Sequence, residues 1–172
     1  APDDAKDLGD VRDGAARAIE ERRRYFREHG AVSSDHSHAD AGTQPLERAD
    51  AERIYTAALR GEVTREEADA FRRHMMSETA RMATQDGLVM RLHPDGRRNH
   101  DPDSRARGGG EAGAGSPVGG ECTHALQPLR GRYGNHPDRT LVVCTSGETV
   151  DARGLARMAG FYRSMHVGVP WW

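Results

Sequence analysis

Residues 140–145, TLVVCT, form an almost unbroken apolar and β-branched run in the second half of the chain. A strand with one solvated face alternates apolar and polar residues, whereas a continuous run is typical of a strand covered on both faces, as in a parallel sheet. Shorter segments with strand-like character lie at 31–35, 88–93 and 165–169. The sequence therefore predicts about four strands.

Helical patterns separate these strands, at about 11–29, 50–60, 64–86, 121–132 and 147–158. The clearest helix start is at Thr64 and Glu67, whose spacing fits a capping box in which each side chain binds an otherwise free backbone N–H. Apolar residues then recur at helical spacing up to Gly87, which is expected to end this helix. Strands joined by helical crossovers of this length are parallel.

Strand–helix alternation predicts an α/β fold, either a barrel or an open doubly wound sheet. No glycine fingerprint for a dinucleotide or a phosphate follows any of the strands. A closed (β/α)8 barrel needs eight strands and about 250 residues, and the 172 residues supply roughly half. We therefore expect a partial TIM-type (β/α)8 barrel of about four parallel strands with flanking helices. It would form one domain over 1–172, truncated at both ends, with a flexible Gly-rich loop over 103–120.

The composition excludes several classes of partner. The 25 basic and 27 acidic side chains are nearly balanced, which argues against nucleic-acid binding because that needs a strong excess of positive charge. No apolar run approaches the roughly 18 residues of a membrane span, and no signal peptide is evident. A cytoplasmic protein is expected. Its apolar content of 35% is low, which predicts a modest core or one that needs partner surface. An open half-barrel would expose sheet edges and apolar surface, which would favour a homo-oligomer.

Polar and aromatic residues cluster where the predicted strands end, which is where parallel β/α folds bind ligands. His36 and His38 are two residues apart on an extended chain and could reach one metal ion, or form a polar loop. His93 is the last residue of a predicted strand, so it is either an active-site residue or a hydrogen-bonded core histidine. Arg98 is a candidate clamp for a carboxylate or a solvated loop residue.

Five short motifs occur in a characteristic order between about Val11 and Trp172: DHSH at 35–38, LHP at 92–94, RNH at 98–100, RYGNHP at 132–137 and GVPWW at 168–172. Their order and spacing resemble uronate isomerase (glucuronate isomerase), a divergent branch of the amidohydrolase superfamily. This resemblance implies a (β/α)8 barrel, of which the chain would be the central to C-terminal part. It also implies aldose–ketose isomerisation of D-glucuronate to D-fructuronate, and of D-galacturonate to D-tagaturonate, in uronate catabolism.

The resemblance assigns roles to particular residues. His93 and Arg98 match catalytic positions of the family. The positions that match its substrate-binding residues are Asp35, His36, Trp171 and Trp172. The substrate would be a uronate sugar, and the family's divalent metal, zinc, is expected to bind residues outside this chain. His36 and His38 are not expected to be its ligands.

The sequence also departs from the family pattern. Residues 105–117 are rich in glycine where an aromatic, acidic loop is usual, and Asp95 interrupts the usual His-Pro-Gly. We expect the chain to be inactive by itself, because the strands for the metal site and for closure are missing. Two alternatives stay open: a metal-dependent hydrolase of the amidohydrolase type, with His36, His38 and His93 converging on one ion, or a non-catalytic remnant that serves as an oligomer-forming module.

Overall fold

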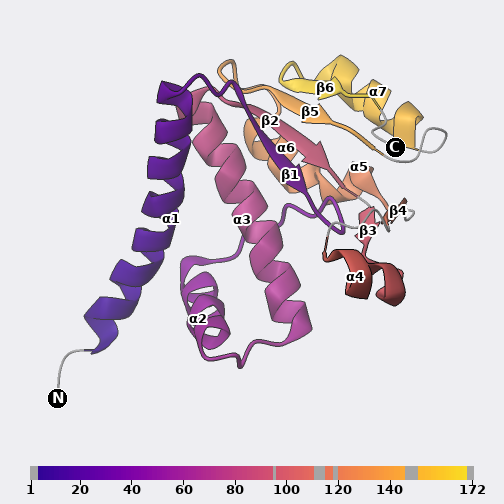
Figure 1. Cartoon of the computed structure of the whole chain (residues 1–172). Coiled ribbons are helices and arrows are strands. Elements are labelled where there is room, and N and C mark those ends of the chain that lie inside the picture. The colour runs from indigo at the N-terminus through magenta and orange to yellow at the C-terminus, as the bar shows by residue number, and fades with distance from the viewer. Residues whose placement is uncertain (1–3, 95, 111–114, 118–119, 146–150, 170–172) are drawn as a thin grey trace.

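The computed structural model describes residues 4–94, 96–110, 115–117, 120–145 and 151–169 (Figure 1). Helices and strands follow one another in this order: α1 (Asp4–Glu28), β1 (Ser33–Ser37), α2 (Arg48–Leu59), α3 (Arg65–Asp86), β2 (Val89–His93), β3 (Gly96–Arg98), α4 (Pro102–Gly108), β4 (Gly115–Pro117), α5 (Cys122–Ala125), α6 (Gln127–Tyr133), β5 (Leu141–Val143), α7 (Asp151–Phe161) and β6 (Met165–Val167). No described helix combines the length and hydropathy needed to cross a bilayer.

Four strands form the main sheet, in the order β1-β2-β5-β6, and all neighbouring pairs are parallel. The predicted strand at 31–35 lies two residues further on, and the other three strands lie within the predicted ranges. The expected partial barrel with four parallel strands is therefore confirmed.

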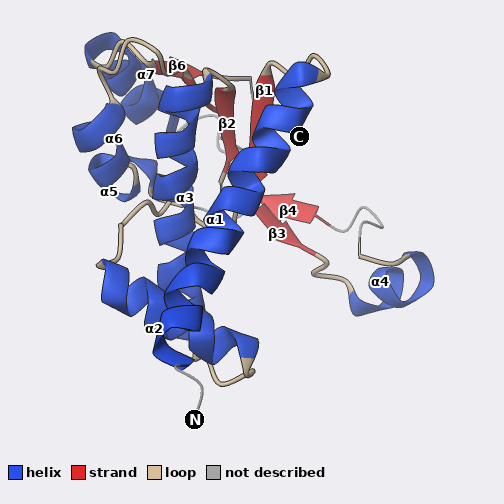
Figure 2. Ribbon diagram, turned by 90° about the vertical axis from the view of Figure 1, so that its left-hand side faces the viewer, coloured by secondary structure: helices blue, strands red, loops and turns tan. Residues whose placement is uncertain are grey.

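One face of the sheet, the helix-covered face, carries the hydrophobic core. Alternate strand residues point to it, and those that are almost fully buried are Met90, Leu92, Leu141, Val143 and Met165. They pack against apolar residues of the helices, among them Ala80 of α3, Leu129 of α6 and Leu155 of α7. Figure 2 shows β3, β4 and α4 projecting away from this helical layer. The opposite face of the sheet, the open face, is left for polar residues.

Local sequence signals explain the best-defined helix. In α3, the Thr64 side chain accepts a hydrogen bond from Glu67 N, and the Glu67 side chain accepts one from Thr64 N. Gly87 ends the helix in the left-handed conformation, with φ of 71°, which glycine adopts without a steric penalty. The predicted capping box is confirmed.

Two segments differ from the expected organisation. The segment 103–120, expected to be a flexible loop, contains most of α4, and its β4 strand pairs antiparallel with β3. The helix expected over 121–132 is divided into α5 and α6, because Pro128 has no N–H to continue the hydrogen bonding of α5 and instead occupies the first turn of α6.

Candidate functional site

Asp35, Arg91 and His93 lie together on the open face, toward the C-terminal ends of β1 and β2. Asp35 Oδ1 is 3.4 Å from His93 Nδ1, and Asp35 Oδ2 is 3.9 Å from Arg91 Nη1. The His93 side chain is only 8% exposed, whereas that of Asp35 is 51% exposed. The Asp35 carboxylate therefore contacts the buried imidazole of His93 on one side and solvent on the other.

The strand register produces this arrangement. Asp35 is the Cα partner of Arg91, and Ser37 is the partner of His93. Because side chains alternate between the faces of a strand, Arg91 and His93 share a face, and the parallel register places Asp35 on the same face of the neighbouring strand. The hydrogen bond from His38 N to His93 O, 3.2 Å long, continues the pairing to the end of β2.

Cys144 borders this cluster from the end of β5. Burial raises the pKa of the Cys144 thiol, against the opposing effect of the positive charge and hydrogen bond of Arg91, so the thiol stays protonated at neutral pH. A side chain at Gly168 would collide with Cys144 Sγ. The close packing of Cys144 against Gly168 therefore fixes β5 relative to the end of β6.

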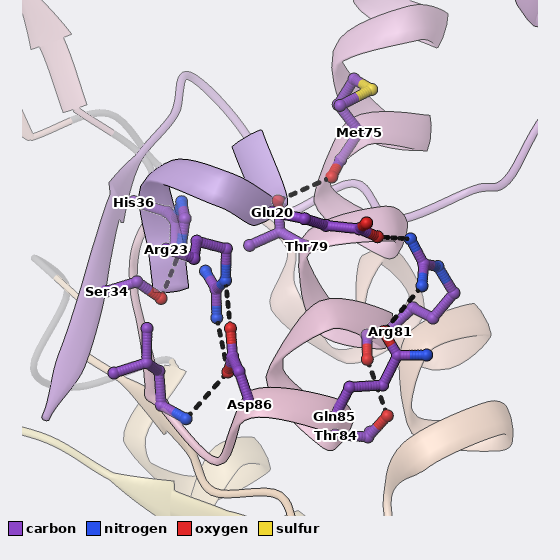
Figure 3. Close-up of polar contacts among 11 residues, drawn as sticks. Glu20, Arg23, Ser34, His36, Met75, Thr79, Arg81, Thr84, Gln85 and Asp86 are labelled. Atoms are coloured by element: carbon purple, nitrogen blue, oxygen red, sulfur yellow. Dashed lines mark hydrogen bonds and ion pairs between the residues drawn. The ribbon is translucent and has the colours of Figure 1, made fainter. Parts of the chain in front are cut away.

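His36 and His38 do not join the Asp35–His93 cluster. His36 is one residue away from Asp35, so it points to the helix-covered face, where its Nε2 is 3.1 Å from Ser34 Oγ beside Arg23 (Figure 3). Burial, together with His38 and Arg23, lowers the pKa of His36 to about 4. Burial and Arg72 also lower the pKa of His38. Both imidazoles are neutral at pH 7.

A metal site that joins His36, His38 and His93 is not formed. Within the described residues, no group of three or more His, Cys, Asp or Glu side chains could hold a metal ion. Alternation along β1 and β2 places His36 on the face of the sheet opposite His93. The geometry therefore gives no support to a metal-dependent hydrolase built on these three histidines, and the described residues offer no set of ligands that fits a zinc ion.

The other residues predicted for the site are only partly described. Arg98 ends β3, where its backbone pairs with Gly115 of β4, but its side chain lies outside the described part of the chain, as do Trp171 and Trp172. The catalytic assignment of Arg98 and the substrate-binding assignments of Trp171, Trp172 and His36 remain predictions. Sequence analysis missed Arg91 and Cys144. The sequence contains a signal for Arg91: it lies two residues before His93 on a predicted strand, so both side chains are expected on the same face.

A cavity of about 1050 Å³ lies between α1, α2 and α3. His36 and His38 contribute to its lining, together with apolar residues such as Phe71 and Met75. None of the lining residues belongs to the Asp35–His93 cluster. We place the candidate site on the open face, because its residues lie at the carboxyl ends of parallel strands.

Parallel strands, each preceded by a helix, define part of a (β/α) barrel, and the acid–histidine pair lies at the strand ends, where such barrels bind ligands. The family model described as glucuronate isomerase matches residues 10–172. The chain belongs to the glucuronate isomerase family.

Individual relatives agree with this assignment. The uronate isomerase of Cutibacterium acnes is 48% identical over 160 residues, which are 93% of this chain and 34% of that protein. The uronate isomerase of Xanthomonas oryzae pv. oryzae is 44% identical over 159 residues, which are 92% of this chain and 34% of that protein. The chain thus spans about a third of the length of the curated relatives it matches.

Solved structures show the same fold. The crystal structure of glucuronate isomerase from Caulobacter crescentus matches with a TM-score of 0.87 and 39% identity, over 92% of this chain and 33% of that one. The crystal structure of uronate isomerase from Thermotoga maritima matches with a TM-score of 0.85, over 93% of this chain and 35% of that one. Its sequence identity is 20%, so this match supports the fold alone.

Proposed function

We propose that this chain supplies one side of a uronate isomerase active site, for conversion of D-glucuronate to D-fructuronate and of D-galacturonate to D-tagaturonate. The observation that carries the proposal is the Asp35–His93 pair at 3.4 Å, at the strand ends of a chain that belongs to the glucuronate isomerase family. We further propose a cytoplasmic role in uronate catabolism, in keeping with the free thiols of Cys122 and Cys144.

The proposed chemistry moves two protons, one from C2 to C1 and one from O2 to O1. The open-chain aldose loses a proton from C2 while its carbonyl oxygen O1 is protonated, which gives the enediol; C1 then gains a proton while O2 loses its own, which gives the ketose. His93 is the proposed base, because an imidazole side chain at the strand ends, beside a carboxylate, is the kind of group that takes up a proton in general base catalysis. The Asp35 carboxylate, with Oδ1 3.4 Å from Nδ1, favours the tautomer that carries its proton on Nδ1, and this leaves Nε2 to receive the substrate's proton.

Substrate recognition is assigned by charge. A uronate carries a carboxylate at the end opposite the carbonyl, and a guanidinium binds a carboxylate through two parallel hydrogen bonds. Arg98 is the proposed carboxylate anchor, and Trp171 and Trp172 are proposed to pack against the sugar. Zinc, if the full site uses it to polarise the carbonyl oxygen, would need ligands other than the described residues.

The experiment that tests this proposal is a titration of the purified 172-residue chain with glucuronate, followed by NMR of the histidine imidazoles. Glucuronate at millimolar concentration is expected to shift the His93 signals, whereas glucose, which lacks the carboxylate, is not. Asp35→Asn should weaken the glucuronate response. An unchanged His93 spectrum, or equal shifts with both sugars, would contradict the assignment.

Turnover is measured on the same sample. With zinc added, we expect no detectable conversion of glucuronate to fructuronate, because the group that polarises the carbonyl is not among the described residues. Robust turnover would show that the chain is active by itself and would refute the view that it holds only one side of the site.

A further inference from the structure

Arg91 lies at the centre of the open face, and the mechanism proposed above assigns it no role. It is the middle residue of β2, which runs between β1 on one side and β5 on the other (Figure 1). Its Cα partners are Asp35 on β1 and Val142 on β5. The Arg91 side chain can therefore bridge the three strands that carry the candidate site.

The two oxygens of the Asp35 carboxylate face different partners. Oδ2 is 3.9 Å from Arg91 Nη1, and Oδ1 is 3.4 Å from His93 Nδ1. The guanidinium and the imidazole therefore do not compete for one oxygen. A carboxylate attracted from one side by Arg91 presents its other oxygen to His93, and the partner of one ring nitrogen determines which nitrogen carries the proton.

Cys144 supports the guanidinium from the β5 side. The register of β2 and β5 places Cys144 at the level of His93, and Arg91 forms a hydrogen bond with the Cys144 side chain. The Arg91 side chain thus extends from its own position toward the carboxyl ends of the strands. Cys144 is buried, and its sulfur packs closely against Gly168, so this support is fixed in place.

The ion pair of Asp35 and Arg91 contributes little to the stability of this chain. The two side chains are 51% and 44% exposed, and the distance of 3.9 Å is longer than a hydrogen bond. Solvent screens pairs of this kind, and holding two long side chains in one geometry costs conformational entropy. Stability therefore does not account for the arrangement, whereas the orientation of a carboxylate beside a buried imidazole does.

We propose that Arg91 is a positioning residue of the site: it holds the Asp35 carboxylate with Oδ1 toward His93, so that the imidazole keeps its proton on Nδ1. Arg91 acts through Asp35 and does not touch the reacting atoms in this role. Without Arg91 the carboxylate is free to turn toward solvent, and the imidazole proton redistributes to Nε2, where it blocks proton uptake from the substrate. The catalytic consequence rests on the proposed function, whereas the tautomer of His93 is a property of the chain without substrate.

Nitrogen-15 NMR of the imidazoles in the 172-residue chain measures this tautomer, at about pH 8, above the usual pKa range of histidine. The native chain should carry the His93 proton on Nδ1. Asp35→Ala should lower the ratio of the Nδ1–H to the Nε2–H form by about tenfold or more, because a charged hydrogen-bond partner is lost. Arg91→Gln should lower it several-fold, and Arg91→Lys, which keeps the charge, should restore most of it. Arg24→Gln is the matched control, since Arg24 forms an exposed ion pair with Glu28 at 4.0 Å, and it should leave the ratio unchanged.

The same samples separate the positioning role from the proposed function. An unchanged ratio in the folded Arg91→Gln chain, equal ratios in the Gln and Lys variants, or a native chain with the His93 proton on Nε2 would overturn the role of Arg91, while a response of His93 to glucuronate would still support the proposed function. A ratio that responds to Arg91→Gln, in a chain whose His93 ignores glucuronate, would support the positioning role and count against the isomerase assignment. Circular dichroism shows whether each variant is folded, and Arg91→Met, which keeps a long side chain without the charge, replaces Arg91→Gln if that variant is not.

Discussion

Gly168 permits a close approach of β5 and the end of β6, which a single methyl group should disrupt. A Cβ at this position would collide with Cys144 Sγ and lie 2.9 Å from Val142 Cγ1. The backbone of Gly168 is not in the left-handed region, so the penalty for alanine is steric. The hydrogen bond from Gly168 N to Val143 O, 2.8 Å long, opposes any outward movement of the chain.

We expect Gly168→Ala to lower the free energy of unfolding by about 1–3 kcal/mol, the usual cost of overpacking. Cys144→Ala removes the sulfur from a buried site and should cost about 1 kcal/mol by itself. In the double variant the Cβ no longer meets the sulfur. The combined loss should therefore be about 1–2 kcal/mol smaller than the sum of the single losses.

Urea unfolding followed by circular dichroism gives these free energies, at one fixed protein concentration so that association contributes equally. Gly160→Ala is the matched control: Gly160 lies in α7, and a Cβ there meets nothing within 4 Å. Replacing a helical glycine by alanine should raise stability by about 0.5–1 kcal/mol. A neutral Gly168→Ala, or strictly additive losses, would refute the steric reasoning.

Two further predictions concern local structure and pH. Thr64→Ala removes the capping box of α3 and should lower the free energy of unfolding in urea by about 1 kcal/mol. Thr56→Ala is the control and should change this free energy little, because the Thr56 hydroxyl only donates to Glu52 O within α2. Equal effects of the two substitutions would contradict the role of the cap. His36 has a folded pKa of about 4 and an unfolded pKa of about 6.5, so the unfolded state binds its proton first as the pH falls. Stability from this group is fully present above about pH 6.5 and declines toward pH 4. His36→Gln should flatten that decline, and His124→Gln, at an exposed site of α5, should not; a slope unchanged by His36→Gln would contradict the burial argument.

Much of the fold was predictable, because it depends on local patterns. The apolar run at 140–145, the capping box and Gly87 placed strands and helices within a few residues. The hairpin of β3 and β4 was not predictable, since its three-residue strands contain glycines and arginines with no alternating pattern. Only pairing over a distance in the sequence identifies them as strands.

The candidate site was predicted in part. Its location at strand ends follows from the general rule for parallel sheets, and His93 and Asp35 lie together there. Asp35 and His36 were assigned to the same substrate, although alternation along a strand sends neighbours to opposite faces. Whether a side chain enters the site depends on the register of β1 against β2, and this register places Asp35 beside Arg91. No short sequence motif encodes the register.

The activity of a graft tests the central claim most directly. Residues 10–172 would replace the matching segment of the Cutibacterium acnes uronate isomerase, and conversion of glucuronate to fructuronate would be measured. The account predicts that the graft is active, that His93→Gln lowers its kcat/KM by about 100-fold or more, and that His124→Gln leaves it unchanged. A folded graft without activity, or one indifferent to the loss of His93, would contradict the claim that this chain carries one side of a uronate isomerase site.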